Sequence, residues 1–311
     1  MPISPEMALF VRENLGDTSN YFVKVSELSR SIFDKNKLGL VYDPLATYSA
    51  RGAFENYMGN CLSFSFLYYS LAKEIGLRVQ FQEVHILPQW DLSEEELFVD
   101  SKHVNVRVNA AGDRDLVVDI DAVSPDRQID YTILDEEYAV SLYYGNKGAE
   151  FLMEDNIQEA FRYFVKAIRL DYNNSAHWTN LGVLYRRAGY DELAERAYYI
   201  ALDFNEDDNA ALSNLAHLYR QAGDHERADY FSDLVKKYHE DNPYYFYYEA
   251  KDAIKEGNYK NALNNINKAI GKNENISLFY KVKSDILNEL GQTSAASRAL
   301  RKAQTVSTDT F

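Results

Sequence analysis

The sequence predicts a protein of two parts, an α+β domain over residues 1–134 followed by an all-α superhelix of repeats over residues 141–306. Two observations predict this division. In the second half, similar residues recur every 34 positions. In the first half, a helical apolar pattern precedes segments in which polar and apolar residues alternate, as in half-buried strands. With 46% hydrophobic residues, the chain has enough apolar side chains for a folded core.

The repeat is clearest in its small residues. Alanine recurs at one register, glycine occupies a second register with Asp155 in the first copy, and large residues mark a third. The three sets are Ala160, Ala194, Ala228, Ala262 and Ala296; Gly189, Gly223, Gly257 and Gly291; and Tyr144, Trp178, Leu212, Phe246 and Tyr280. Each copy predicts two helices that approach closely at alanine and are joined by a tight turn at the glycine. One copy cannot bury its apolar face alone, so the copies are expected to stack.

This pattern resembles the tetratricopeptide repeat. The stretch from Ser175 to Asp208 has a tryptophan, leucine, glycine and tyrosine where that family has them. The copies span about 141–174, 175–208, 209–242, 243–276 and 277–306. The resemblance implies a groove for a protein or peptide partner, lined by the first helix of each repeat.

Basic residues fall at the registers that would face this groove. They are Arg186, Arg187, His217, Arg220, Lys251 and Lys255. In a chain of net charge -15, such a stripe predicts an acidic peptide or a terminal carboxylate as the partner. The alternative is that these are ordinary solvated positions. The tyrosines of "PYYFYYEA" are either additional stacking surface or core residues at helical spacing.

Cys61 is the single cysteine of the chain, and it follows Gly-Asn at the start of an apolar helical pattern. Residues 5–14, 21–36 and 62–75 read as helices, and Asn60 is a good N-cap for the third. Cys61 therefore lies in a first helical turn, where unpaired N–H groups and the helix dipole favour a thiolate. The alternative is a small buried side chain, since free cysteine is often buried.

Three strands are expected at residues 78–87, 102–109 and 115–121. Ala110-Ala111-Gly112 fits a three-residue hairpin loop between the last two. That register sets Arg107 opposite Asp115 and His103 opposite Asp119, about 5 Å apart on one face. A slip of one residue would turn Asp119 to the other face.

Together these residues predict a catalytic triad. Cys61 is the nucleophile, His103 the base, and Asp119 the carboxylate that orients the imidazole. The expected chemistry is acyl transfer through a thioester, either hydrolysis or transfer to an amine. His85 is an alternative base and Asp121 an alternative acid. Asn60 is a candidate oxyanion donor beside the Cys61 backbone N–H. The acidic segment Pro88–Ser101 is either a solvated helix or a lid with Trp90 at its lip.

The segments "GNCLSFSFLYYSLAKEIGLRVQF", "HVNVRV" and "VVDID" resemble, in order and spacing, the transglutaminase-like core of the papain-type superfamily. The match covers roughly residues 50–122 and implies the nucleophile, base and acid at Cys61, His103 and Asp119. The alternative is a non-catalytic protein-binding scaffold with a degenerate transglutaminase-like fold. A third alternative is a protein that processes its own partner.

Composition also indicates which partners, ligands and cofactors are not expected. The net charge of -15 disfavours nucleic acid and anionic membranes as partners. No apolar stretch is long enough for a membrane span, and no signal peptide is expected. One cysteine and scattered histidines do not predict a zinc site, and there is no phosphate-binding loop, so we expect no metal or cofactor. A lone thiol fits the reducing cytoplasm.

Overall fold

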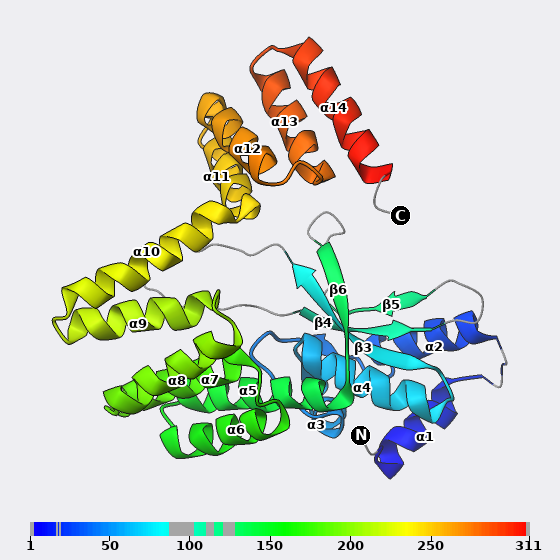
Figure 1. Ribbon diagram of the computed structural model, residues 1–311. Coiled ribbons are helices and arrows are strands. Elements are labelled where there is room, and N and C mark those ends of the chain that lie inside the picture. The colour runs from blue at the N-terminus through cyan, green and yellow to red at the C-terminus, as the bar shows by residue number, and fades with distance from the viewer. Residues whose placement is uncertain are drawn as a thin grey trace. The chain divides into compact units, whose positions relative to one another are not determined.

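The computed structural model describes residues 3–16, 18, 20–86, 103–109, 115–120 and 128–308. The chain forms two compact units (Figure 1). The first contains helices α1 to α8 and all of the described strands, and the second contains helices α9 to α14. The predicted α+β region and the first two repeats therefore share one compact unit.

Four helices begin the first unit: α1 (Pro5–Asn14), α2 (Tyr21–Phe33), α3 (Ala50–Asn56) and α4 (Cys61–Glu74). The sequence predicted α1, α2 and α4, but it did not predict α3. Each begins at a side chain that accepts a backbone N–H bond, namely Ser4, Asn20, Ser49 and Asn60. The helix start expected at Cys61 is therefore confirmed.

The described strands form a four-stranded sheet in the order β5-β4-β3-β6 and a small parallel pair, β1 with β2. The strands are β1 (Val41–Tyr42), β2 (Met58–Gly59), β3 (Val79–Ile86), β4 (His103–Val108), β5 (Leu116–Val118) and β6 (Gln128–Leu134). Strands β3, β4 and β5 were expected from alternation, whereas β6 was not. All pairings in the larger sheet are antiparallel.

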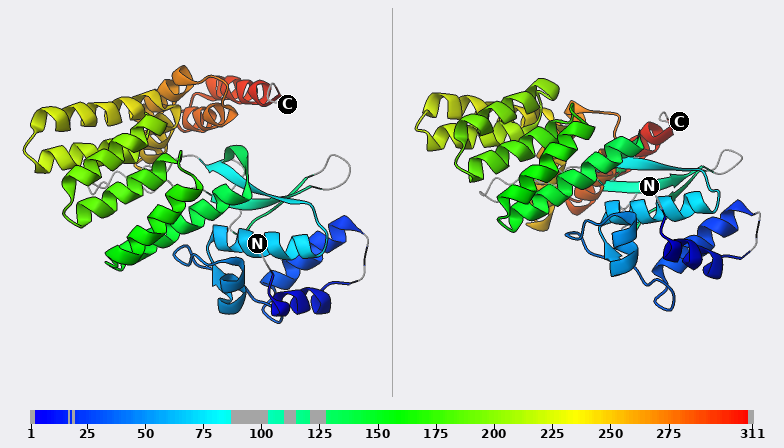
Figure 2. Two further views of the ribbon diagram at one scale, coloured as in Figure 1. Left: turned by 60° about the horizontal axis from the view of Figure 1, so that its bottom comes forward. Right: turned by 90° about the horizontal axis from the view of Figure 1, so that it is seen from below.

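The core of the first unit lies between α4 and one face of this sheet. Val104, Val106 and Val108 of β4 are buried there, as is Phe81 of β3. In both views of Figure 2, helices α1 to α4 lie on one side of the sheet. His103 and Asn105 alternate with these valines along β4, and both are also buried. Strand β4 therefore carries a buried polar face.

The expected register of β4 with β5 is wrong by two residues. Arg107 lies opposite Val117, not Asp115, and Val106 lies opposite Val118. Continuing this register places Asp119 opposite Asn105. Because the shift is even, every side chain keeps its predicted face. The expected hairpin loop lies outside the described residues.

Over residues 136–308, ten described helices form five pairs. They are α5 (Glu136–Met153), α6 (Ile157–Leu170), α7 (Ser175–Arg187), α8 (Asp191–Phe204), α9 (Asn209–Gln221), α10 (His225–Asp241), α11 (Pro243–Lys255), α12 (Tyr259–Lys272), α13 (Ser277–Glu289) and α14 (Thr293–Thr308). Each pair falls on one of the five predicted copies, although α5 begins at Glu136, before the first copy, and α14 ends at Thr308, after the last.

The two small-residue registers do what the sequence predicted. The five alanines from Ala160 to Ala296 are all buried, between the helices. Gly189 turns the chain after α7 with a φ of 78°. Asp155 occupies the same register in the first copy with a φ of 60°, a conformation that costs a residue with a side chain more than it costs glycine.

Helix α5 belongs both to the α+β core and to the first repeat. Its Ala139 is fully buried in the core that α4 forms with the sheet. Farther along α5, the ring of His177 on α7 contacts Ser141, with 3.0 Å between Nε2 and Oγ. A Cβ at Gly148 would lie 2.5 Å from the ring of Phe164 on α6, so only glycine permits this approach.

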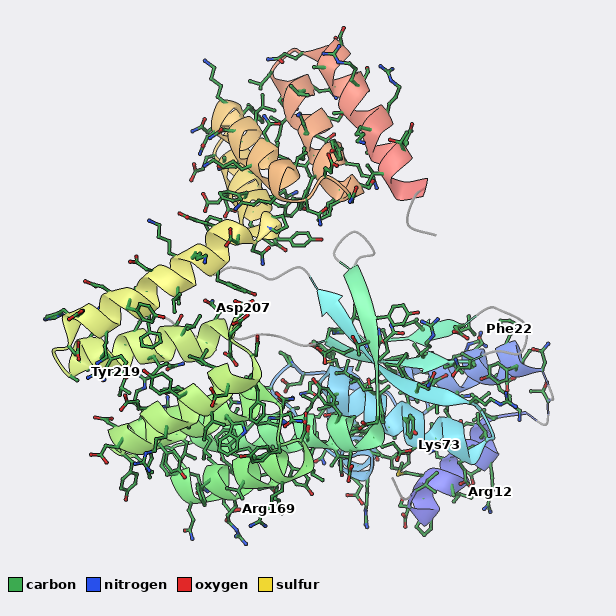
Figure 3. All side chains as sticks on the ribbon, viewed as in Figure 1. Arg12, Phe22, Lys73, Arg169, Asp207 and Tyr219 are labelled. Atoms are coloured by element: carbon green, nitrogen blue, oxygen red, sulfur yellow. The ribbon has the colours of Figure 1, made fainter. Side chains whose placement is uncertain are left out.

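In the second unit, aromatic residues pack between the helices. Tyr219 on α9, which Figure 3 labels, stacks on Phe231, and the guanidinium of Arg227 lies over the Tyr219 ring. Tyr247 is buried and stacks on Phe279. Of the alternatives for "PYYFYYEA", the structure therefore favours core packing at Tyr247.

Candidate active site

Cys61 is the first residue of α4 and is partly exposed. Asn60 precedes it as the N-cap, and its Oδ1 accepts the Ser63 backbone N–H at 3.0 Å. A residue at this position has a backbone N–H that no carbonyl of its own helix can accept. The sequence therefore places a thiol and an unpaired donor together at one helix end.

Gly59 explains why glycine precedes this cap. A Cβ at Gly59 would lie 2.6 Å from the Cβ of Ser63, closer than real side chains approach. Ser63 is fully buried, and its hydroxyl donates to the Ala46 carbonyl at 3.0 Å. The Gly-Asn-Cys sequence therefore lets β2 pass against the first turn of α4.

His103 and Asp119 form a buried pair. The distance from His103 Nε2 to Asp119 Oδ2 is 2.6 Å, and the side chains are 7% and 9% exposed. The contact predicted from sequence is present, but it runs diagonally between the strands because of the register shift. Long side chains on one face can make such diagonal contacts.

Asn105 is a site residue that sequence reasoning missed. Its side chain is 1% exposed, and its Nδ2 donates to Asp119 Oδ2 at 3.0 Å. The carboxylate is thus held by the imidazole and by an amide from the same strand. The signal available in the sequence was the alternation of β4, which sets Asn105 and His103 on one face, but the role of Asn105 required the register.

The Cys61 thiol lies close enough to the His103 ring to be one of the groups that raise the pKa of His103. Because Nε2 faces Asp119, Nδ1 is the ring nitrogen left for the thiol. Burial disfavours the charged imidazole, but the hydrogen bond with Asp119 and the interaction with Cys61 outweigh it and raise the pKa of His103 to about 10. At neutral pH the ring therefore retains a proton beside the sulfur.

These contacts form a continuous chain from thiol to imidazole to carboxylate. Such an arrangement can move a proton between the sulfur and Nδ1 while the carboxylate fixes the ring and stabilises its charge. The thiol end of the chain is partly exposed and the carboxylate end is buried. Cys61 is therefore the most exposed of the three residues.

The other sequence candidates are less favourably placed. The carboxamide of Asn60 bonds Thr47 and Ser63 and is buried, so it acts as the helix cap. Its use as an oxyanion donor stays a prediction that these bonds do not favour. Asp121, Trp90 and the Pro88–Ser101 segment lie outside the described residues. His85 lies on β3, and its side chain is likewise not described.

The predicted basic groove residues divide between the two compact units. Arg186 and Arg187 belong to the first unit; His217, Arg220, Lys251 and Lys255 belong to the second. Several contact their own chain: Arg187 donates to the Leu152 carbonyl at 2.6 Å, Arg220 to Ser232 at 3.0 Å, and Lys255 pairs with Asp252 at 2.7 Å. Arg220, Lys251 and Lys255 are exposed.

Two other features concern partners and ligands. Among the residues that the structure describes, no cluster of His, Cys, Asp or Glu side chains is arranged to hold a metal ion. Within the same described ranges, no helix combines the length and apolar character that a membrane crossing needs.

No family model and no curated protein matches the sequence. Among solved structures, PilF of Pseudomonas aeruginosa aligns at 16% identity and a TM-score of 0.33, covering 55% of this chain and 78% of that one. MamA aligns at 16% identity and a TM-score of 0.30, covering 53% of this chain and 91% of that one. YrrB, described as a TPR protein with an unusual peptide-binding site, aligns at 14% identity and a TM-score of 0.30. The alignment covers 55% of this chain and 88% of that one.

Scores this low carry no argument about function. The helical pairs and the 34-residue register give the second half of this chain the architecture of a helical repeat array, like that of tetratricopeptide superhelices. The transglutaminase-like fold of the first half stays a prediction.

Proposed function

We propose that this chain binds a protein partner through its repeat array and that Cys61 carries out acyl chemistry on a protein or peptide. The array supports the binding role because stacked helix pairs present extended surfaces to partners. The acyl chemistry is supported by one observation, the continuous contact from Cys61 through His103 to Asp119. The transglutaminase-like resemblance of residues 50–122 is part of the same proposal.

In the proposed reaction, the thiol proton lies on Nδ1 of His103 and the thiolate attacks a substrate carbonyl. The Cys61 backbone N–H donates to the oxyanion that develops. As the C–N bond breaks, His103 returns its proton to the leaving amine, and a thioester to Cys61 forms. Water or a second amine then attacks the thioester, with His103 accepting its proton. Asp119 holds the ring throughout.

A non-catalytic scaffold is the second candidate. It is favoured by the repeat array, whose stacked helix pairs are a surface for a protein partner that needs no reacting group. In that case His103 and Asp119 are a buried structural pair, and the repeats alone carry the function. The two candidates differ in whether the thiol is activated by the histidine.

The rate of alkylation of Cys61 by iodoacetamide at pH 6 separates them. An activated thiol should react at least about tenfold faster in the wild type than in His103→Ala, because the thiolate is the nucleophile. The matched control is His225→Ala, an exposed histidine at the start of α10 in the second unit. Equal rates in all three proteins would refute the acyl site and leave the scaffold.

An acidic partner is a finer part of the proposal and is tested separately. Arg220→Glu and Lys251→Glu reverse two exposed charges of the second unit. Fluorescence anisotropy with an acidic peptide of random order measures the effect at two salt concentrations. Loss of binding that follows the charge reversal supports an electrostatic site, and unchanged binding rejects it.

A further inference from the structure

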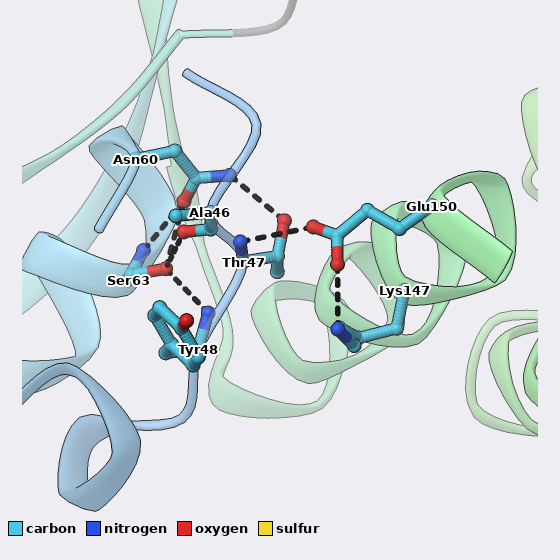
Figure 4. Close-up of polar contacts among 7 residues, drawn as sticks. All are labelled: Ala46, Thr47, Tyr48, Asn60, Ser63, Lys147 and Glu150. Carbon is cyan, nitrogen blue, oxygen red and sulfur yellow. Dashed lines mark hydrogen bonds and ion pairs between the residues drawn. The ribbon is translucent and has the colours of Figure 1, made fainter. Parts of the chain in front are cut away.

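The cap of the cysteine helix is connected to the first helix of the repeat array through hydrogen bonds that are buried or partly buried. Asn60 Nδ2 donates to Thr47 Oγ1 at 2.9 Å, and the Thr47 backbone N–H donates to Glu150 Oε1 at 2.9 Å (Figure 4). Glu150 lies on α5, and its Oε2 accepts a bond of 2.5 Å from Lys147 Nζ. The path runs from Glu150 through Thr47 to Asn60, which is the residue before Cys61.

The segment 46–48 acts as a clamp on the first turn of α4. The Asn60 backbone N–H donates to the Ala46 carbonyl at 2.9 Å, and the Ser63 hydroxyl donates to that carbonyl at 3.0 Å. The Tyr48 backbone N–H donates to the Ser63 hydroxyl at 2.7 Å. Residues on both sides of Cys61 in the chain are therefore fixed by this segment, which we call the 46–48 clamp.

Glu150 holds the clamp from the outside. Thr47 is 2% exposed, so without Glu150 its backbone N–H would be a buried donor with no acceptor in this arrangement. A buried donor without an acceptor costs free energy, so the segment is expected to move until the Thr47 N–H meets another acceptor or water. Movement of Thr47 would in turn release the amide of Asn60, which is the cap of α4.

Helix α5 is at the same time fixed to the repeats. At Gly148, two residues before Glu150, the α5 backbone lies so close to Phe164 of α6 that no side chain fits. A Cβ at Gly145 would meet the His177 ring of α7 at 3.2 Å. Helix α5 therefore moves with α6 and α7, and Glu150 moves with it.

From this geometry we infer that Glu150 is a positioning residue: it transmits the placement of the first repeat to the 46–48 clamp and so sets Cys61 against His103. The inference rests on the proposed acyl function and adds a connection between the array and the site. Of the described residues, the titratable group bonded to Cys61 is His103, which is itself paired with Asp119. Glu150 acts on neither directly.

The test compares Glu150→Ala with Glu150→Gln and with Glu136→Ala. Gln keeps an oxygen that can accept the Thr47 N–H. Glu136 is the matched control because it also joins α5 to α4, accepting from Tyr69 and Lys73, but at the end of α4 far from Cys61. Hydrogen exchange of peptides from residues 57–66 reports the cap, and alkylation at pH 6 reports the thiol.

We expect Glu150→Ala to raise exchange in the first turn of α4 and to slow alkylation, each by about tenfold, because small displacements at a reacting group have large effects. Glu150→Gln should restore both, and Glu136→Ala should change neither beyond its effect on melting temperature. If Glu150→Ala lowers the melting temperature as Glu136→Ala does and changes neither readout, the role is only structural and the inference is overturned.

Failure of the acyl function is recognised separately. A wild-type thiol that His103 does not activate refutes the acyl site, whereas hydrogen exchange still decides whether Glu150 holds the cap. Faster exchange in Glu150→Ala supports the mechanical link, and unchanged exchange overturns it.

Discussion

The buried pair of His103 and Asp119 predicts that stability falls as pH rises. In the unfolded chain the imidazole titrates near its ordinary value of 6.5, while in the folded protein its pKa is raised to about 10. Between these values the folded protein retains a proton that the unfolded chain has released. The stabilisation is therefore complete below pH 6.5 and is lost as pH rises toward 10.

The magnitude follows from proton linkage. Each pH unit inside this window reduces the free energy of unfolding by up to about 1.4 kcal/mol. A fall of about 2–3 kcal/mol is expected between pH 7 and pH 9. Removing one member of a buried pair costs about 3–5 kcal/mol, so Asp119→Asn should lose that amount at pH 6 and should also abolish the slope.

The assay is urea unfolding at several pH values, in the wild type and in a Cys61→Ser background, where Asp119 is the remaining group that raises the His103 pKa and the pH window is therefore narrower. With Trp90 replaced by phenylalanine, Trp178 on α7 is the remaining tryptophan and reports the first unit. Asp115→Asn is the matched control, because Asp115 pairs with Arg107 and not with a histidine. A slope that persists in Asp119→Asn, or that is absent in the parent, would refute the reasoning.

Two further predictions concern glycine registers of the repeats, and both are measured by thermal or urea unfolding. Asp155→Gly should raise the free energy of unfolding by about 0.5–1 kcal/mol, because it relieves a φ of 60°, whereas Gly189→Ala at a φ of 78° should lower it by about 1–2 kcal/mol. Gly182→Ala should cost about 1–3 kcal/mol, since its Cβ would lie 2.4 Å from the Tyr198 ring. The contrast is Gly271→Ala in α12, where no atom lies within 4 Å of the new Cβ and a gain of about 0.5–1 kcal/mol is expected. An equal effect at Gly182 and Gly271 would contradict the packing argument.

The repeat array was predictable because its signals are local and recur. An alanine, a glycine and a large residue at fixed offsets define each helix pair without knowledge of any distant contact. Asp155 shows how far the register reaches, since it takes the glycine conformation in a copy that lacks the glycine. The start of α4 was predictable for the same reason, because an N-cap acts within one turn.

The parts that sequence reasoning missed depend on distant contacts. Strand β6 pairs Leu134 with Phe81, and the expected end of the first domain fell at that strand. The bond between Thr47 and Glu150 joins residues 103 positions apart. No pattern within either segment indicates its partner, so such contacts are known only when the fold is known.

The strand register shows why the candidate site was nevertheless found. The expected hairpin was wrong by two residues, yet His103 still meets Asp119 and Arg107 still meets Asp115, at 2.7 Å. An even shift preserves the face of every side chain, and long side chains bridge the resulting diagonal. Burial of Val104 and Val106 strongly determines which face of the sheet each β4 side chain occupies. The register of β4 with β5 depends instead on the loop between them.

The observed register also gives Asp119 a second contact, which the expected register would not have given it. With Asp119 opposite Asn105 and diagonal to His103, its carboxylate receives both the amide and the imidazole on one oxygen. In the expected register Asn105 would lie opposite Val117. The observed arrangement therefore holds Asp119 from two sides, and the orientation of the His103 ring toward Cys61 follows from a register that alternation alone could not determine.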